Sequence, residues 1–559
     1  MNVVILRTAA AARRHRLFTS VLLIGVALRV AVQIAYSPAL LYIDSVRYLY
    51  AESNWDPLGY LVMLWPLLKI GGLALVAITQ HLLGLFMAVA IYVLALRWGA
   101  RRWVGALAAA PVLFDAYQLQ LEQNIMADTL FEAVVLTGLA ALLWHSHPRV
   151  RNIAFAGLAF GLAAIVREIG LLLVIPAAAF VWLAARGHLG TGLTTRGGGP
   201  VPAGLARRAL TQPVSRISRH PVSRAALLCA SFAVPVIGYL LANFAATGRL
   251  EFAGQGSNLY GRAAAAANCV TLRIPSYESA LCPTRAARGL GVDGLMHNPR
   301  SPALKFKAPA GMSSRALRGD FTRQVLLQQP LRVAAAIADD VAGSFAYPRG
   351  PGQADTPIFR WQFQASYPAF PPGLRPAREA EITRQFGGGA PTVVRPLAAA
   401  LRAYQLDGGY TPGPVLALAG LIGVLGAAGA ERVWRRGKRH AGRAGPTPPP
   451  AGSPSPPVRQ APLPAGPIPA RSYPAGLRTA CLLVVSTGMV LLVGADIIEF
   501  SWRYQLPGLV TLPLAAALGF AALTGRQPST GQAGTTAAGL AQSRSAAELA
   551  AEVKAPVDA

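Results

Sequence analysis

The sequence predicts an all-α protein that crosses a membrane about ten times. Hydrophobic residues make up 53% of the 559 residues, charged residues make up only 14%, and the mean hydropathy is +0.41. A soluble domain carries about 25% charged residues, so this composition indicates a membrane protein. Apolar segments of roughly 20 residues, the length of a helix that crosses a bilayer, recur along the chain. Because these runs are long and lack regular Gly/Pro breaks, they favour helices over barrel strands.

The connections between the predicted spans alternate in charge. We place the spans at residues 17–36, 73–96, 102–116, 127–145, 152–166, 168–185, 225–246, 412–430, 479–498 and 506–524. Every second connection is basic: residues 186–224 hold seven arginines and no acid, and residues 432–478 hold nine Lys or Arg residues and no acid. The positive-inside rule puts these connections in the cytoplasm. It therefore predicts a multi-pass protein of the cytoplasmic membrane with both termini cytoplasmic.

The net charge of +28 has its main source in these basic connections. Basic loops orient a helical bundle and lie against anionic lipid headgroups. A nucleic-acid partner is not expected, because the sequence has no basic folded domain with interleaved aromatic residues. Membrane lipid is the expected partner of this charge.

The chain divides into six predicted regions by composition. They are a transmembrane core (1–246), an extracytoplasmic segment or cap (247–411), one further transmembrane helix (412–430), a disordered Pro/Arg-rich cytoplasmic linker (431–478), a C-terminal transmembrane pair (479–524) and a disordered tail (525–559). The extracytoplasmic segment contains Cys269 and Cys282, thirteen residues apart. A disulfide between them is expected outside the cytoplasmic membrane. A metal site there is not expected, since no histidine accompanies the pair at ligand spacing.

Charged residues gather at the predicted outer ends of the spans. A charge at the bilayer centre costs roughly 2.5–3.5 kcal/mol on insertion scales, so charges at helix ends are cheaper and can form a site on one membrane face. These residues are Asp44, Asp115, Glu122, Asp128, Arg167 and Arg503. The first outer connection, residues 37–72, is also unusual because it begins with an acid among aromatics and continues into an apolar stretch with Trp65 and Lys69. That pattern is typical of a helix lying along the membrane surface.

Four short motifs at these ends resemble the GT-C superfamily of integral membrane glycosyltransferases. Asp44 and the element WDPLGY match the acidic motif and the Pro/Gly/Tyr element of the family's first outer loop. The other motifs are FDAYQLQLEQNIMADTLFEAVVL with Asp128, AIVREIGLLLVIP with Arg167, and FSWRYQLPGLVTLPLAAA with Arg503. The resemblance is nearest to the protein O-mannosyltransferase and aminoarabinose-transferase branch. It covers residues 17–185 and 479–524, leaves 247–411 unmatched, and departs from the branch at Ser45, where a second acid is frequent.

The resemblance implies a bundle of about ten transmembrane helices, with a membrane-parallel helix in the first outer loop. It implies transfer of a sugar from a polyprenyl-phosphate donor to an extracytoplasmic acceptor, with inversion. The acceptor is a cell-wall glycan, a lipid or a protein. A divalent cation, Mg²⁺ or Mn²⁺, shared by Asp44 and Asp128 is a further expectation.

The chemistry of this reaction requires a base for the acceptor hydroxyl and positive charge for the departing phosphate. By resemblance, Asp44 is the expected base and Asp128 positions the acceptor. Guanidinium and ammonium groups suit the phosphate oxygens. The candidates for this role are Arg47, Lys69, Arg167 and Arg503.

Each candidate also has a purely structural explanation. Asp44 could belong to a solvated ion pair, and Asp128 could stabilise the N-terminus of a helix. Lys69 could extend to the membrane interface, and Asp115 and Glu122 could be solvated loop acids. At the level of the whole chain, the alternatives are a transporter or lipid flippase and a catalytically inactive membrane scaffold. A transporter predicts acids midway along spans and internal repeats, and the sequence shows neither.

Overall fold

The structure is a computed structural model, and it describes residues 13–51, 57–192, 220–252, 258–350, 356–366, 376–429 and 475–524. The regular secondary structure of the described residues is helical, apart from a short antiparallel ribbon of β1 (Tyr36–Ser37) and β2 (Thr392–Val393). The all-α prediction is confirmed. The predicted tail and nearly all of the predicted cytoplasmic linker fall outside the described residues, as do Trp55 and Asp56 of the WDPLGY element.

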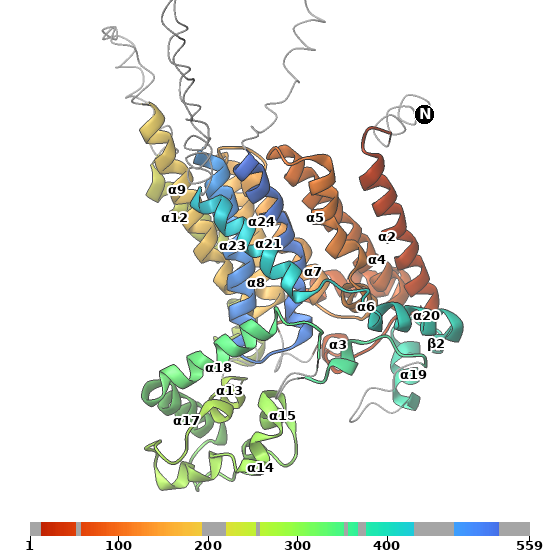
Figure 1. The fold of residues 1–559 in the computed structure, drawn as a ribbon. Coiled ribbons are helices and arrows are strands. Elements are labelled where there is room, and N and C mark those ends of the chain that lie inside the picture. Colours follow the sequence, from red (N-terminus) through yellow and green to blue (C-terminus); the bar gives the residue numbers. More distant parts are fainter. Residues whose placement is uncertain are drawn as a thin grey trace, which may run out of the picture.

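Apolar helices, together with the short polar helix α6, form a bundle (Figure 1). They are α2 (Arg16–Ala35), α4 (Leu61–Arg97), α5 (Arg102–Phe114), α6 (Ala116–Gln123), α7 (Asp128–Leu143), α8 (Val150–Val166), α9 (Val174–Gly192), α12 (Pro221–Thr247), α21 (Gly413–Ala428), α23 (Ala475–Asp496) and α24 (Leu506–Thr524). Within the described ranges, six helices are long and apolar enough to cross a membrane, or seven if α5 and α6, bent by 50°, form one span. A multi-pass membrane protein is therefore confirmed, while its orientation stays a prediction.

Small residues bring several of these helices into close contact. Gly157 and Gly161 of α8 face α12, where an added Cβ would lie 2.5 Å from the Leu228 carbonyl oxygen and 2.3 Å from that of Phe232. Gly519 of α24 meets the backbone of α21 in the same way. Helices in lipid associate through such close packing, because the apolar surroundings give no hydrophobic drive between them. The glycines thus hold α8 against α12 and α24 against α21, and α8 and α24 each contribute a residue to the site described below.

A kink divides α4 near its start. Gly71 and Gly72 have non-helical backbone angles, and Gly72 adopts φ +65°, which favours glycine. An added Cβ at Gly72 would lie 2.0 Å from the Gly387 carbonyl oxygen, so the position also requires the absence of a side chain. The kink separates the segment 61–70 from the long remainder of α4, which begins where the sequence predicted a span to start.

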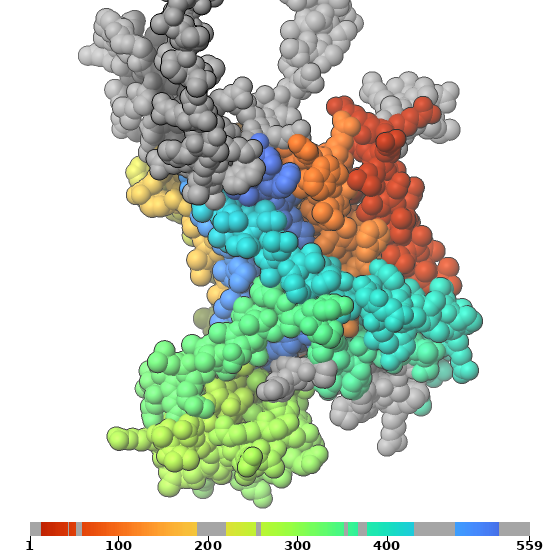
Figure 2. All heavy atoms as spheres, in the orientation of Figure 1, coloured from red at the N-terminus to blue at the C-terminus, as the bar shows by residue number. Residues whose placement is uncertain are grey.

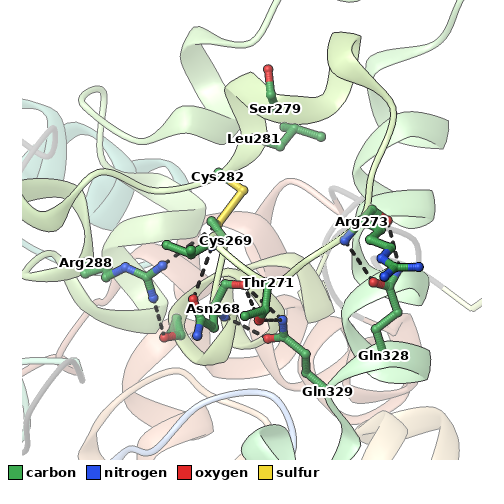
Figure 3. The surroundings of a disulfide bond; sticks show 12 residues. Asn268, Cys269, Thr271, Arg273, Ser279, Leu281, Cys282, Arg288, Gln328 and Gln329 are labelled. Atoms are coloured by element: carbon green, nitrogen blue, oxygen red, sulfur yellow. Dashed lines mark hydrogen bonds between the residues drawn. A yellow bond between two sulfur atoms is a disulfide. The ribbon is translucent and has the colours of Figure 1, made fainter.

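The segment 247–411 forms two parts. Residues 258–343, which we call the outer subdomain, contain α13 (Asn258–Ala266), α14 (Arg285–Arg288), α15 (Gly291–His297), α16 (Pro302–Lys305), α17 (Ser314–Gln328) and α18 (Pro330–Gly343) around their own apolar core. Cys269 and Cys282 are joined by a disulfide in this subdomain, with a Cα–Cα distance of 6.1 Å. Figure 3 shows Gln329, which follows α17, bonded to Asn268 beside the disulfide.

The second part packs on the bundle instead. It contains a 3₁₀ turn, η4 (Ile358–Trp361), and the helices α19 (Pro376–Gln385) and α20 (Arg395–Leu406). Phe363 and Leu401 share an apolar cluster with Val32 of α2 and Leu119 of α6. The space-filling view shows that both parts cover the end of the bundle opposite the start of α2 (Figure 2). Between this cover and the helix ends lies the candidate site.

Candidate active site

A cavity of about 480 Å³ lies between the covered end of the bundle and the two parts of the outer segment. Its walls come from α3 (Ile43–Leu49), the start of α7, the 3₁₀ turn η2 (Glu168–Leu173), α15, η4 and residues 491–507. Five of the six predicted catalytic and substrate-binding residues line it: Asp44, Arg47, Asp128, Arg167 and Arg503. These residues come from four segments far apart in the sequence.

Arg503 lies at the centre of the charged residues. Its Nη1 donates a hydrogen bond of 2.7 Å to Oδ2 of Asp44, and its Nε lies 3.7 Å from Oδ1 of Asp128. The guanidinium also stacks on Trp361 and Tyr504, with its carbon 5.0 and 4.9 Å from the two ring centroids. A 3₁₀ turn, η5 (Trp502–Gln505), presents this side chain just before α24 begins. One cation therefore connects the two predicted catalytic acids.

Asp44 lies in the first turn of α3, where the helix dipole favours a negative charge. Ser45 accepts a hydrogen bond of 2.8 Å from the Tyr42 backbone N–H and helps to cap this helix. Arg47, one turn later, lies 3.3 Å from Oδ1 of Asp44. Burial alone raises the pKa of Asp44, but the guanidinium groups of Arg503 and Arg47 outweigh it and hold that pKa below its usual value. Asp44 is therefore ionised at neutral pH.

Asp128 occupies the first turn of α7 and forms an ion pair with Arg167. Arg167 lies at the break between α8 and η2, where the backbone is extended, and its guanidinium lies over the ring of Tyr504. Oδ2 of Asp128 is buried without a hydrogen-bond partner among the residues that the structure describes. Such an atom in a cavity wall is available to a substrate.

Several residues that line the cavity were not predicted from the sequence. Glu499 accepts a hydrogen bond of 3.3 Å from the Tyr504 hydroxyl, which itself accepts one of 3.0 Å from Nη2 of Arg503. Burial and the nearby Asp293 carboxylate raise the pKa of Glu499 to about 7. Glu499 lies four residues before Arg503, so its position beside the matched motif was a usable signal. The outer segment carried no such signal for Asp293, His297, Arg360 or Trp361.

Lys69, the sixth predicted residue, is not among the residues that line the cavity. Its side chain is exposed on the short segment of α4 before the kink, away from the cavity lining. The segment buries Leu64 and turns its C-terminal residues outwards, so the ammonium group reaches solvent or an interface instead of the site.

Asp115 and Glu122 are not the solvated loop acids that the sequence suggested, because both are buried outside the cavity. Glu122 lies 2.8 Å from Arg29 and 2.9 Å from Nδ1 of His81. Asp115 caps α6 by accepting from the Tyr117 backbone N–H and is paired with a buried arginine of the outer segment. Their partners explain their burial.

The acids of the cavity do not offer the donor set that a divalent cation prefers. Across the described part of the chain, no group of three or more His, Cys, Asp or Glu side chains is arranged to hold a metal ion. Both oxygens of Asp44 face arginines, and Oδ1 of Asp128 faces Arg167 and Arg503. A cation between these acids would have to displace guanidinium groups that already neutralise them.

Comparisons with protein-family models, with curated proteins and with solved structures found no match for this chain. The geometry of the cavity and the resemblance of its motifs are therefore the grounds for a functional proposal.

Proposed function

We propose that this chain is a GT-C-type membrane glycosyltransferase of the cytoplasmic membrane, with about ten spans and cytoplasmic termini. It transfers a sugar from a polyprenyl-phosphate donor to an acceptor on the outer face, with inversion at the anomeric carbon. The observation that carries the proposal is the convergence of Asp44, Asp128, Arg167 and Arg503 in one cavity at the end of the bundle. Four motifs spread over about 460 residues contribute to it.

The charges in the cavity suit this reaction. Arginine recognises phosphate through paired N–H donors, and Arg47, Arg167 and Arg503 supply such groups beside two carboxylates. A donor phosphate competes with Asp44 for Arg503, and its binding frees that carboxylate to accept the proton of the acceptor hydroxyl. Neutralising the phosphate also stabilises it as a leaving group. The same arginines therefore activate the donor and release the base.

The apolar part of the cavity suits the polyprenyl chain. Ile169, Leu491, Ala495 and Ile498 form this part between η2 and α23. A lipid-linked sugar that enters from the bilayer would place its tail along such a surface. The segment 61–70 supports a membrane-parallel helix, since Val62 and Ile70 are 75% and 77% exposed and Trp65 lies between them.

The test is mass spectrometry of the lipid-linked sugars in a deletion strain that carries wild-type or variant protein. One polyprenyl-phosphate sugar should accumulate in the deletion strain and in strains with Asp44→Asn or Arg503→Lys. Asp407→Asn is the matched control, because Asp407 is an exposed acid of the outer segment. An unchanged pool in the deletion strain, with no parallel enzyme present, would leave the transferase proposal without support.

A lipid flippase is the second candidate, and one observation favours it. Arg29, Glu122 and His81 form a buried network of ionisable residues between α2, α4 and α6, and ionisable residues within a membrane frequently serve transport. Arg29 also donates to the backbone carbonyls of Gly25 in α2 and Leu113 in α5, which indicates a structural role in joining these two helices. Reconstituted lipid flipping that survives Asp44→Asn would favour this candidate.

A further inference from the structure

The cavity has a second wall that the charged motifs do not explain. This outer wall comes from the segment 247–411, which matches no motif of the resembling family. Its polar lining residues are Asp293, His297, Asn298, Thr356, Arg360 and Trp361. It faces the bundle wall that holds the arginines and the apolar surface between η2 and α23. The two walls therefore differ in chemistry, and a donor of the proposed kind uses only one of them.

Several buried polar atoms of the cavity lack partners within the described residues. The indole Nε1 of Trp361 is one, although Trp361 is only 3% exposed. Nε of Arg360 and Oγ of Ser501 are two more. A buried donor or acceptor without a partner costs about 1–3 kcal/mol, so native proteins rarely keep one unless a ligand or water satisfies it. Three such atoms around one cavity point to a bound molecule with hydrogen-bonding groups.

The outer wall is held rigidly, as a binding site requires. Gln405 of α20 is fully buried, donates to the Trp361 carbonyl at 3.0 Å and accepts from the Phe363 backbone N–H at 2.7 Å. Arg360 donates to the Tyr42 hydroxyl at 2.9 Å and lies 3.8 Å from Asp293 of α15. These contacts hold the side chains of the wall in defined positions.

The mixture of donors and acceptors on this wall identifies the class of ligand. Asp293 accepts hydrogen bonds, whereas Arg360 and Trp361 donate them. A sugar hydroxyl both donates and accepts, so neighbouring hydroxyl groups of a glycan match such a mixture. The wall is built from helices and a 3₁₀ turn, and the described part of it offers no strand edge to a peptide backbone. Its apolar residues, such as Val292 and Met296, are too few to hold a second lipid chain.

We propose that the outer wall is the acceptor subsite and that the acceptor is a glycan. This inference rests on the proposed transferase function and narrows its acceptor. In the reaction, a glycan hydroxyl oxygen bonds to the anomeric carbon of the donor while the bond from that carbon to the phosphate oxygen breaks. The hydroxyl proton passes to the carboxylate of Asp44, and the bonding electrons leave with the polyprenyl phosphate. Trp361 and Asp293 orient the glycan for this step.

The test measures glycan and lipid binding separately on the full-length protein in lipid nanodiscs. The probes are a panel of pentose and hexose oligosaccharides, the same oligosaccharides on a polyprenyl anchor, Ser/Thr peptides, and polyprenyl phosphate. Trp361→Phe removes one N–H and keeps an aromatic ring beside Arg503, and Asp293→Asn is the second variant. Trp103→Phe is the matched control, because Trp103 is 47% exposed on α5, far from the cavity.

The wild-type protein should bind one class of oligosaccharide, and each cavity variant should weaken that binding about tenfold, the effect of losing one good hydrogen bond. Polyprenyl-phosphate binding should not weaken in either variant, because Trp361→Phe keeps an aromatic ring on Arg503 and Asp293→Asn only removes a negative charge. The control should bind both probes normally. Stronger binding of the anchored form would assign the glycan to a lipid carrier, and equal binding would assign it to a free chain.

Two results would overturn the inference and leave the transferase proposal in place. One is binding of Ser/Thr peptides instead of oligosaccharides, and the other is wild-type glycan affinity in both cavity variants. If the wild-type protein binds neither polyprenyl phosphate nor any oligosaccharide, the inference and the proposed function fail together.

Discussion

Replacing Arg349 with methionine should destabilise the protein more than any surface substitution. Arg349 of the outer segment and Asp115 of the bundle have fully buried side chains. Nη1 and Nη2 of Arg349 lie 3.2 and 3.0 Å from the two carboxylate oxygens. The guanidinium is also enclosed by aromatic rings, with its carbon 4.4 Å from the Tyr117 centroid and 4.9 Å from that of Tyr410. This pair attaches the outer segment to the bundle.

The expected cost follows from what remains buried. Arg349→Met leaves Asp115 with backbone donors only, from Tyr117 at 3.0 Å and from Thr411 at 2.7 Å. Breaking a buried ion pair at one partner costs about 3–5 kcal/mol, because the other charge stays buried without compensation. Arg349→Met combined with Asp115→Asn removes both charges and keeps an oxygen to cap α6. The double variant should therefore recover about 2 kcal/mol or more of that loss.

The assay is thermal unfolding of the purified protein in nanodiscs, arranged as a double-mutant cycle. Arg378→Met is the control, since Arg378 pairs with Glu381 on the exposed surface and such pairs contribute at most about 1 kcal/mol. An Arg349→Met variant as stable as the control, or a double variant whose losses simply add, would refute the reasoning. Folded Arg349→Met should still bind polyprenyl phosphate, because Asp115 lies outside the cavity.

Four further predictions concern single features. Because Glu499 has a pKa raised to about 7, its neutral form stabilises the fold below about pH 4.5 and this contribution is lost as the pH rises through 7. The free energy of unfolding of Glu499→Gln, relative to that of the wild type, should therefore rise by up to about 3 kcal/mol from pH 5 to pH 8 in thermal unfolding experiments. A difference that does not change with pH would contradict this. Cys282→Ser removes the disulfide that closes a loop of thirteen residues in the outer subdomain, which should lower the free energy of unfolding by about 3 kcal/mol. Limited proteolysis of residues 258–343 should be faster in this variant. Lys69→Gln should leave the pool of lipid-linked sugars at its wild-type level. Accumulation of a polyprenyl-phosphate sugar in this variant would show that Lys69 takes part in the reaction. EDTA should leave sugar transfer by the purified protein unchanged, since arginines already neutralise the cavity acids, and rescue of a lost activity by Mg²⁺ or Mn²⁺ would contradict this.

The sequence predicted the bundle and one wall of the cavity for a common reason. Apolar runs of bilayer length are local signals, and so are acids or arginines at their ends. Asp44, Asp128, Arg167 and Arg503 each lie beside such a run, so they could be identified one at a time. Their convergence needed only that the ends face the same side of the membrane.

Buried pairs between distant segments gave no local signal. Asp115 and Arg349 are 234 residues apart, and neither sequence neighbourhood indicates the other. Glu122 looked like a loop acid because a short polar helix carries it, yet α2 and α4 supply Arg29 and His81 around it. Tertiary packing decides such cases, and local propensity does not contain that information.

The outer segment matches none of the sequence motifs, yet it affects how strongly the charged motif residues of the cavity interact with one another. Trp361 covers the guanidinium of Arg503, and Arg360 holds Tyr42 beside α3. Excluding water from this region lowers the local dielectric constant, and two charges then interact several times more strongly than in water. The contact between Arg503 and Asp44 is therefore strong because residues about 140 positions before Arg503 cover it. A variant that loosens η4, such as Gln405→Ala, should therefore weaken the contact between Arg503 and Asp44, although Gln405 itself bonds to Trp361 and Phe363 and to neither charged residue.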